Sequence, residues 1–398
     1  MRSLAVFTKN MDDLDLGVAE LKEKLSDFKL GRNSLGVVFA HAETDFEELG
    51  KKLSSEFKFP IMGCSAMSLF SEQQGYAKEG ISFHVFTADD CSFAAGMTAE
   101  LTEDNYKAEI KRTFNKLKND LGGWRPKVII TYAVKNPKIP GDEFVNVLDD
   151  ASGGIPVFGG FCSDNFVFSE CSVMLNSQQS RSGMVMVLIG GDTKPVIKGE
   201  FSVETVADFD EVVTEARGNV VYKLGNKTMV EALRAAGFDL ETQDLVMQFV
   251  GSPFLVTFTS VEGDEIQVIR NLDSIDLESG AGIFLGNVPK GAHIQLAMFT
   301  RRDVARSVAK AIQSAIVDVG NEHKYEYTSA IITSCVSRLM TFTNDDMVDE
   351  TKGYSAVIPR SIRFSGMYSY GEFCPIISKA TGNVHNCFHN TTFCFIVL

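Results

Sequence analysis

The feature that most constrains the fold is a strand–helix–strand–hairpin pattern that occurs three times along the chain. In each copy an apolar, strand-like run is followed, after a helical stretch, by a second run that contains a glycine. The pairs of first run and glycine are Val37 with Gly63, Val128 with Gly159, and Ile331 with Gly366. Such recurrence is typical of internally repeated folds. We therefore predict a mixed α/β fold of repeated units, with mixed sheets flanked by helices, in which these three strands are equivalent.

The first copy also carries helix and turn signals. Apolar residues from Leu14 to Phe28 recur at helical spacing, and Asp12 or Asp13 precedes them as a predicted cap. The residues Thr44-Asp45-Phe46-Glu47 have the form of a capping box with Thr44 as the cap. Residues 81–86 and 91–98 are two short apolar runs, and we predict that they form a hairpin. In the third copy, a helical stretch is predicted to reach Val357.

A change of pattern near residues 200–212 suggests two halves. The acidic stretch 205–210 has no apolar period, and Gly218-Asn219 then marks a hairpin turn. A second capping box, Thr228 to Glu231, opens a further helix. We predict an N-terminal domain of residues 1–205 and a C-terminal domain of residues 206–398.

Charge and apolar run length exclude several classes of partner. The chain has 398 residues, and its 38 basic and 52 acidic side chains give a net charge of −14. Nucleic acids and anionic membranes require basic surfaces, so we expect neither as a partner. The apolar runs are too short to span a bilayer, and the first residues do not form a signal peptide. Eight cysteines without a C-x-x-C pair indicate reduced thiols, so we expect a cytoplasmic protein.

Motifs that would indicate an enzyme are weak. Neither a Walker loop nor an H-E-x-x-H zinc motif occurs. The run from Gly63 through Ser65 to Met67 resembles a nucleophile elbow, but Met67 replaces the glycine that the sharp turn needs. Ser307 and Lys310 have S-x-x-K spacing within a helical pattern, where a solvated helix face explains them better than acyl transfer does. We therefore expect no catalytic residues and no enzyme activity.

Polar residues are concentrated in five glycine-punctuated stretches at the ends of apolar strands. Glycine allows a backbone to approach a ligand closely, and polar groups that converge there can orient it. From these stretches we predict ligand-binding roles for Cys64, Ser65, Asp164, Asn165, Ser334, Arg338, Tyr368, Tyr370, Glu372, His389 and Asn390.

Arg338 and Glu372 allow two interpretations. Each follows an apolar strand, where an unpaired charge would be costly to bury. The two side chains can pair with each other, which is a structural role. Alternatively, Arg338 binds a ligand carboxylate while Tyr370 and Glu372 receive an amine or hydroxyl.

The same five stretches resemble the motifs of the FIST family, in the family order. They are the Gly-Cys-Ser turn at Gly63–Ser65, the segments Gly159–Asn165, Ser334–Arg338 and Gly366–Glu372, and the terminal run His389–Thr392. The resemblance covers nearly the whole chain, in an N-terminal and a C-terminal FIST half. Two segments, Phe161–Ser163 and Phe373–Pro375, are bulkier than the usual family residues and would reshape a pocket.

The resemblance implies a sensory module for signal transduction that binds a small molecule, amino acids having been proposed as ligands. Family members are often attached to, or encoded near, histidine kinases and chemoreceptors. It therefore implies that ligand occupancy is relayed to a separate signalling partner. The sequence favours no cofactor and no metal, although some FIST proteins look like haem proteins. A haem-binding gas sensor is thus the alternative, with one axial ligand among His41, His84, His293, His323, His385 and His389.

Overall fold

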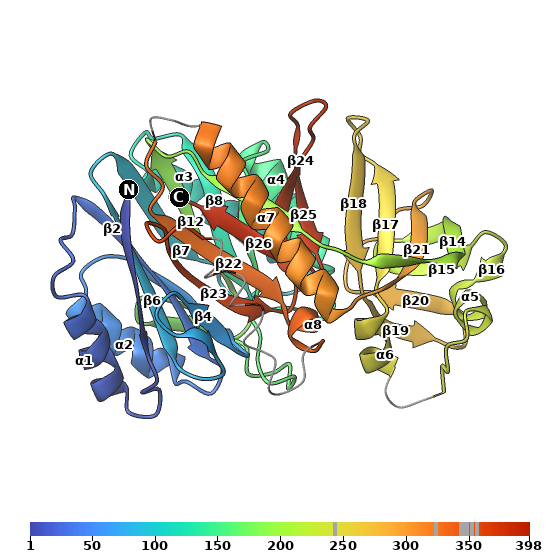
Figure 1. Cartoon of the computed structure of the whole chain (residues 1–398), viewed down its shortest axis with the longest axis horizontal. Helices are drawn as coiled ribbons and strands as arrows, with labels where there is room; N and C mark the ends of the chain where they lie inside the picture. The colour runs from blue at the N-terminus through green and yellow to red at the C-terminus, as the bar shows by residue number, and fades with distance from the viewer. Residues whose placement is uncertain (242–244, 322–324, 342–349, 351–353, 355–357) are drawn as a thin grey trace.

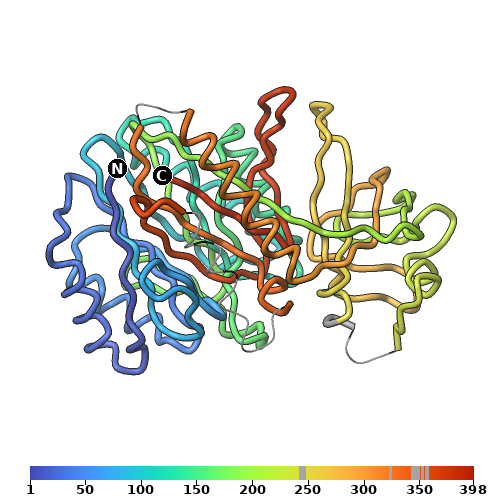
Figure 2. The backbone as a smooth tube through the Cα atoms, in the orientation of Figure 1, coloured from blue at the N-terminus to red at the C-terminus, as the bar shows by residue number. Residues whose placement is uncertain are grey.

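The computed structural model describes residues 1–241, 245–321, 325–341, 350, 354 and 358–398. Most of the chain forms a body of three sheets flanked by helices, and residues 204–298 form an outer lobe at one end of it (Figure 1). The chain passes from the body into the outer lobe and later returns (Figure 2). No helix within the described ranges combines the length and the apolar character needed to cross a membrane.

Three copies of one unit build the body, and this confirms the predicted repeat. Each copy contributes two parallel strands, a two-stranded hairpin and two further antiparallel strands. In the first copy these elements are β1 (Arg2–Thr8), α1 (Leu14–Lys24), β2 (Asn33–His41), α2 (Phe46–Glu56), β3 (Ile61–Ala66), β4 (Leu69–Ser71), β5 (Gly75–Ala77) and β6 (Ile81–Ala88).

The second copy repeats this order without interruption. It consists of β7 (Cys91–Met97), α3 (Tyr106–Asp120), β8 (Pro126–Ala133), α4 (Gly141–Ser152), β9 (Val157–Phe161), β10 (Val173–Leu175), β11 (Gln178–Ser180) and β12 (Met184–Gly191). The third copy consists of β13 (Val196–Glu200), α7 (Arg301–Asn321), β22 (Ser329–Cys335), α8 (Val336–Leu339), β23 (Arg363–Ser369), β24 (Glu372–Ile377), β25 (Val384–His389) and β26 (Phe393–Val397). The outer lobe is thus inserted into the third copy, between β13 and α7. Most of the helical stretch predicted to reach Val357 lies outside the described residues.

The three six-stranded sheets have equivalent strand orders. The parallel pairs are β2 with β3, β8 with β9, and β22 with β23. Val37, Val128 and Ile331 lie in β2, β8 and β22, so the predicted equivalence is confirmed. In each copy the hairpin leaves its own sheet and joins the sheet of another copy: β4 pairs with β23, β10 with β3, and β24 with β9. This cyclic exchange ties the first, second and third copies into one body.

Two local predictions need correction. Residues 81–86 and 91–98 do not form a hairpin, because β6 pairs within the first sheet while β7 pairs with β12 in another. The cap of α2 is Asp45, whose carboxylate accepts a hydrogen bond from the Glu48 amide at 2.9 Å, and not Thr44. Asp13 does cap α1, and the Thr228–Glu231 capping box is present as predicted.

The outer lobe has its own apolar core around an eight-stranded antiparallel sheet. Its elements are β14 (Glu204–Arg217), β15 (Val220–Leu224), β16 (Lys227–Thr228), α5 (Met229–Ala235), α6 (Leu245–Gly251), β17 (Phe254–Thr259), β18 (Glu265–Arg270), β19 (Leu272–Asp276), β20 (Ala281–Phe284) and β21 (His293–Met298). The predicted hairpin turn at Gly218 joins β14 to β15, and Gly218 has a φ of 61°. The domain boundary at residue 205 stays a sequence prediction, since both predicted halves contribute strands to the body.

A buried ion pair joins the outer lobe to the body. Arg270, at the end of β18, is 1% exposed, and its Nη2 lies 2.7 Å from Asp142 Oδ1 on α4. Its Nη1 donates a further hydrogen bond to the Phe388 carbonyl at 2.8 Å. Because an unpaired buried guanidinium would be costly, these bonds fix how this part of the lobe meets the body.

Candidate functional site

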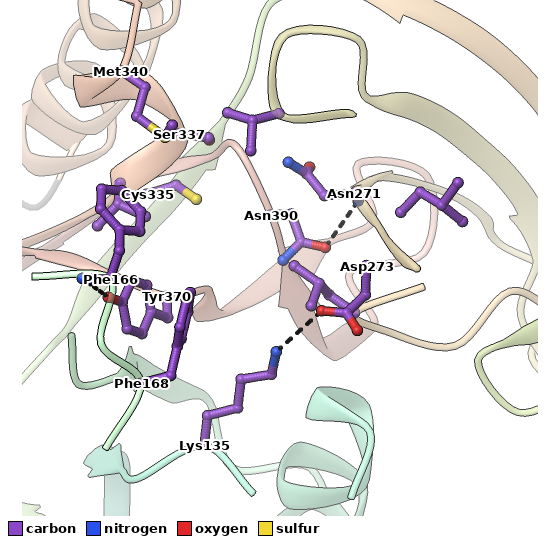
Figure 3. Close-up of a pocket in the computed structure, with 14 residues that line it drawn as sticks. Lys135, Phe166, Phe168, Asn271, Asp273, Cys335, Ser337, Met340, Tyr370 and Asn390 are labelled. Carbon is purple, nitrogen blue, oxygen red and sulfur yellow. Dashed lines mark hydrogen bonds and ion pairs between the residues drawn. The ribbon is translucent and has the colours of Figure 1, made fainter. Parts of the chain in front are cut away.

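A cavity of about 300 Å³ lies between the body and the outer lobe. On the body side it is bordered by the carboxyl ends of two parallel strand pairs, β8 with β9 and β22 with β23. Lys135 lies two residues after β8, Cys335 is the last residue of β22, and Tyr370 follows β23 directly (Figure 3). Ligands of open α/β sheets commonly bind at such strand ends, so the position is that of a candidate site.

The cavity walls are mainly apolar. The apolar lining residues from the body are Phe166, Phe168, Val336 and Met340, and those from the outer lobe are Val250, Leu272 and Leu285. Polar groups come from Lys135, Asn271, Asp273, Ser337 and Asn390. An apolar enclosure with a few polar groups is the usual composition of a small-molecule site.

An aromatic cluster forms one wall of the cavity. The Phe168 and Tyr370 rings are stacked with centroids 4.9 Å apart, and the Phe166 ring lies 6.1 Å from that of Tyr370. Phe166 and Phe168 are 41% and 61% exposed, although apolar side chains of this size are usually buried. Both have positive φ angles, 61° and 59°, which non-glycine residues rarely adopt. Strained, exposed aromatic residues at a cavity are a feature of functional loops.

Asp164 holds this aromatic loop in place. Its Oδ1 accepts hydrogen bonds from the amides of Val167 and Phe168, at 3.1 and 3.0 Å. The Tyr370 hydroxyl donates to the same Oδ1 at 2.6 Å and accepts from the Phe166 amide at 2.9 Å. Burial would raise the pKa of the Asp164 carboxyl, but the hydrogen bonds from Tyr370 and the loop amides dominate and lower it. The loop strain is therefore offset by bonds to an ionised carboxylate.

Lys135 and Asp273 place one positive and one negative charge at the cavity. The Lys135 Nζ lies 3.8 Å from Asp273 Oδ1, so the pair spans the contact between body and lobe without a hydrogen bond (Figure 3). Burial lowers the pKa of the Lys135 amine, and the Asp273 carboxylate opposes this shift. The pair offers a ligand two charged groups that are not saturated by each other.

Comparisons with known proteins decide the family. A family model of the FIST N domain matches residues 34–227, and one of the FIST C domain matches residues 230–375. The chain belongs to the FIST family. FIST domains are associated with sensing in signal transduction. A search of curated proteins finds no match.

Tyr370 and Asn390 are the two predicted FIST-motif residues that line the cavity. Tyr370 contributes its ring to the wall, because its hydroxyl already donates a hydrogen bond to Asp164 Oδ1. Asn390 Oδ1 accepts a hydrogen bond from the Asn271 amide at 3.3 Å and so joins body and lobe beside the cavity. The Ser334–Arg338 motif contributes Cys335 and Ser337 to the wall, which lie between its predicted site residues.

Ser334, Arg338 and Tyr368 form a buried cluster behind the cavity. The interpretation in which Arg338 pairs with Glu372 is wrong, because the guanidinium bonds to Glu350, with Nη2 3.0 Å from Oε1. Ser334 and Tyr368 bond to the same carboxylate, the Tyr368 hydroxyl at 2.5 Å. Sequence patterns missed Glu350 because it lies in the predicted helical stretch and in none of the five polar motifs. The cluster satisfies the Arg338 charge within the body.

Glu372 and His389 are also buried, next to each other in paired strands. The Glu372 carboxylate accepts hydrogen bonds from Ser369 Oγ at 2.6 Å and the Thr392 amide at 3.3 Å. Burial raises the pKa of Glu372 to about 8, and it lowers the pKa of His389 to about 4. His389 Nε2 lies 2.9 Å from the Cys374 carbonyl. Neither side chain lines the cavity.

Cys64, Ser65 and Asn165 lie away from the cavity. Cys64 is fully buried, with its Sγ 3.2 Å from Met367 Sδ. Ser65 is also fully buried and donates a hydrogen bond to the Ser163 carbonyl, which links the first and second copies. The Asn165 amide donates to Glu43 at 3.1 Å on the surface. A binding role for these residues stays a prediction, and the contacts described here are structural.

The described cavity residues include no histidine for the haem alternative. His389 lies outside this lining, and its Nε2 lies 2.9 Å from the Cys374 carbonyl. His385 Nε2 lies 2.8 Å from Asp264 Oδ2, while His323 lies outside the described residues. Across the described part of the chain, no cluster of three His, Cys, Asp or Glu side chains is arranged to hold a metal ion.

Several cavity residues were not predicted from the sequence. Lys135 could have been found, because it comes shortly after the predicted strand that contains Val128. Phe166 and Phe168 lie directly after a predicted polar motif but read as ordinary apolar residues. Asn271 and Asp273 come from the outer lobe, and no local pattern indicates that they meet the body.

Proposed function

We propose that this FIST protein is a sensory ligand-binding module whose small-molecule ligand occupies the cavity between the body and the outer lobe. The observation that carries the proposal is the Lys135–Asp273 pair at the mainly apolar cavity, where Lys135 Nζ and Asp273 Oδ1 are 3.8 Å apart and the side chains are 24% and 50% exposed. By contrast, the buried guanidinium groups of Arg270 and Arg338 each have a carboxylate partner within hydrogen-bonding distance. Incompletely paired charges beside apolar walls gain from a ligand that completes their bonding.

An amino acid with an apolar side chain is the ligand class we propose. Its carboxylate would bind the Lys135 amine and its ammonium group the Asp273 carboxylate. Its side chain would contact the rings of Phe168 and Tyr370. Charge-assisted hydrogen bonds give such a head group orientation, and burial of its apolar part adds affinity.

The proposed output is a shift between two arrangements of body and lobe. A ligand that touches Lys135 on the body and Asp273 on the lobe favours the arrangement that brings them together. A separate signalling protein, such as a histidine kinase or chemoreceptor, would read that arrangement. We propose binding and relay as the role of the site, and no catalytic step.

Thermal-shift screening of the twenty amino acids and of small carboxylates tests this function. A ligand at a hundredfold excess over its Kd should stabilise the protein by about 2.7 kcal/mol. Calorimetry on Lys135→Met should then show at least about tenfold weaker binding, since a charged hydrogen bond contributes roughly 1.5–3 kcal/mol. Lys138→Met is the matched control, because Lys138 lies in the same loop with a 70% exposed side chain. Equal binding by both variants, or no stabilising compound, would refute the proposal.

A further inference from the structure

The Lys135 amine differs from the other lysine of its loop in solvation and in pairing. Its side chain is 24% exposed, and within the described part of the chain Asp273, at 3.8 Å, is its one charged partner. Lys138 is 70% exposed and forms an ion pair with Glu103 at 3.1 Å. An ammonium group gains most of its stability from water and from acceptors within about 3.2 Å. Lys135 has little contact with water, and its carboxylate partner Asp273 lies beyond hydrogen-bonding distance.

The physical consequence is a larger neutral fraction of the Lys135 amine. Burial lowers its pKa, and Asp273 is too distant to restore it fully. A neutral amine carries a free electron pair, and lysines desolvated in apolar sites act as nucleophiles toward carbonyl compounds. The cavity of about 300 Å³ gives a small carbonyl compound room beside the amine.

We propose that Lys135 captures aldehydes and ketones that enter the cavity, as a reversible imine on its Nζ. This inference rests on the proposed function only in that the cavity is the ligand site. It adds a second ligand class, apolar carbonyl compounds, to the zwitterions proposed above.

The step balances without an oxidant or a reductant. The Nζ electron pair forms a bond to the carbonyl carbon, and the carbonyl oxygen takes up a proton to give a carbinolamine. The C–O bond then breaks, water leaves, and the nitrogen loses its remaining extra proton to form the C=N bond. The Asp273 carboxylate, 3.8 Å from Nζ, can accept the proton from nitrogen and return it to the departing hydroxyl. Water reverses the reaction.

The cavity walls indicate the carbonyl compound that suits the site. The Phe168 and Tyr370 rings are stacked with centroids 4.9 Å apart and form a flat apolar wall. A planar aromatic aldehyde can pack against this wall while its carbonyl group reaches the amine. Benzaldehyde is therefore a suitable probe, and benzyl alcohol is its matched control, because it has the same ring and cannot form an imine.

Reductive trapping tests the proposal on the whole protein. The protein is treated with limiting benzaldehyde and cyanoborohydride, and benzylated lysines are located by peptide mass spectrometry. We expect Lys135 to carry most of the label, well above Lys138, and excess benzyl alcohol to suppress that label. Lys135→Arg should lose the label, and its melting temperature should show that it folds. Labelling of Lys135 no greater than that of Lys138, or unaffected by benzyl alcohol, would overturn the proposal.

The two proposals fail in different ways. If amino acids bind by calorimetry and Lys135 is not trapped, the imine is refuted and the sensory function stands. If Lys135 is trapped selectively and no amino acid binds, the imine is supported and the zwitterion is refuted as the ligand.

Discussion

In the described part of the chain, two cavities of similar volume but different lining lie between the body and the outer lobe. The candidate site, of about 300 Å³, is mainly apolar, and its charged groups Lys135 and Asp273 are 3.8 Å apart. The other cavity, of about 290 Å³, has both polar and apolar lining residues, and several of its charged side chains are hydrogen-bonded to protein. There Asp142 pairs with Arg270 at 2.7 Å, and Asp149 accepts a hydrogen bond from Asn386 at 2.6 Å.

We call the region around the second cavity the clasp. It includes Asp264, which follows β17 and accepts hydrogen bonds from side chains of the β24–β25 hairpin. These donors are Ser378, Thr381, Asn383 and His385. Two cavities of nearly equal volume can therefore differ in how completely their charged groups are bonded. Hydrogen-bonded polar groups join the lobe to the body at the clasp, whereas the proposed ligand site has incompletely bonded charges beside apolar walls.

The largest expected effect is at the clasp. Arg270→Ala removes a guanidinium that bonds to Asp142 and leaves that carboxylate buried without its partner. Breaking a buried pair in this way costs about 3–5 kcal/mol, so the free energy of unfolding in urea should fall by this amount. Arg217→Ala, at an exposed position of the outer lobe, should change it by less than about 0.5 kcal/mol. A similar small loss for both variants would show that the clasp does not anchor the lobe.

A pH-dependent effect should come from Glu372, behind the wall of the candidate site. Its pKa is raised by burial to about 8, above the ordinary value of about 4.3. The stability that the neutral carboxyl contributes is complete below about pH 4.3 and is lost as pH rises through about 8. Glu372→Gln stays neutral, so its stability relative to the wild type should rise between about pH 5 and pH 8. A stability difference between wild type and Glu372→Gln that stays constant with pH, measured by urea denaturation, would contradict this.

Asp264 at the clasp should have the opposite pH dependence. Its pKa is lowered by hydrogen bonds, first of all from Ser378. The stability that its carboxylate contributes is present above the ordinary pKa of about 3.9 and is lost as pH falls. The destabilisation caused by Asp264→Asn should therefore shrink in acid, below about pH 4. A difference that stays constant into acid would show that the clasp carboxylate is not stabilised by these bonds.

The smallest effect on stability is expected in the aromatic loop. Tyr370→Phe keeps the ring but removes the hydroxyl that bonds to Asp164 and to the Phe166 amide. The net loss should be about 1 kcal/mol, because Asp164 keeps three amide donors. Ligand affinity should fall as well, since the cavity wall is less well ordered. Tyr222→Phe, in the outer lobe, is the control. Unchanged ligand affinity in Tyr370→Phe would show that the order of the aromatic loop does not contribute to binding.

The sequence predicted the body better than the site. Val37, Val128 and Ile331 identified equivalent strands because a buried parallel strand leaves a continuous apolar run. The pairing of the hairpins with the sheets of other copies was not predicted. β4 and β10 are three residues long, and their partner strands lie in other copies. Strand pairing of that kind is decided by tertiary packing and not by local pattern.

Of the candidate site, Tyr370 and Asn390 were predicted because they belong to polar stretches at strand ends. Lys135 and Asp273 were not predicted together, since one comes from the body and the other from the inserted lobe. Arg338 showed the limit of pattern reasoning most clearly. Its burial was expected, but its partner Glu350 follows no motif and becomes its neighbour only through the fold.

Hydrogen–deuterium exchange with and without the tightest-binding amino acid tests most directly that the cavity, and not the clasp, binds the ligand. Amide exchange slows where a ligand suppresses local opening. At saturating ligand we expect slower exchange in residues 164–171 and 335–341, which border the cavity, and unchanged exchange in residues 260–266 and 378–386 at the clasp. Protection confined to the clasp, or no protection beside the cavity at saturation, would contradict the assignment of the candidate site.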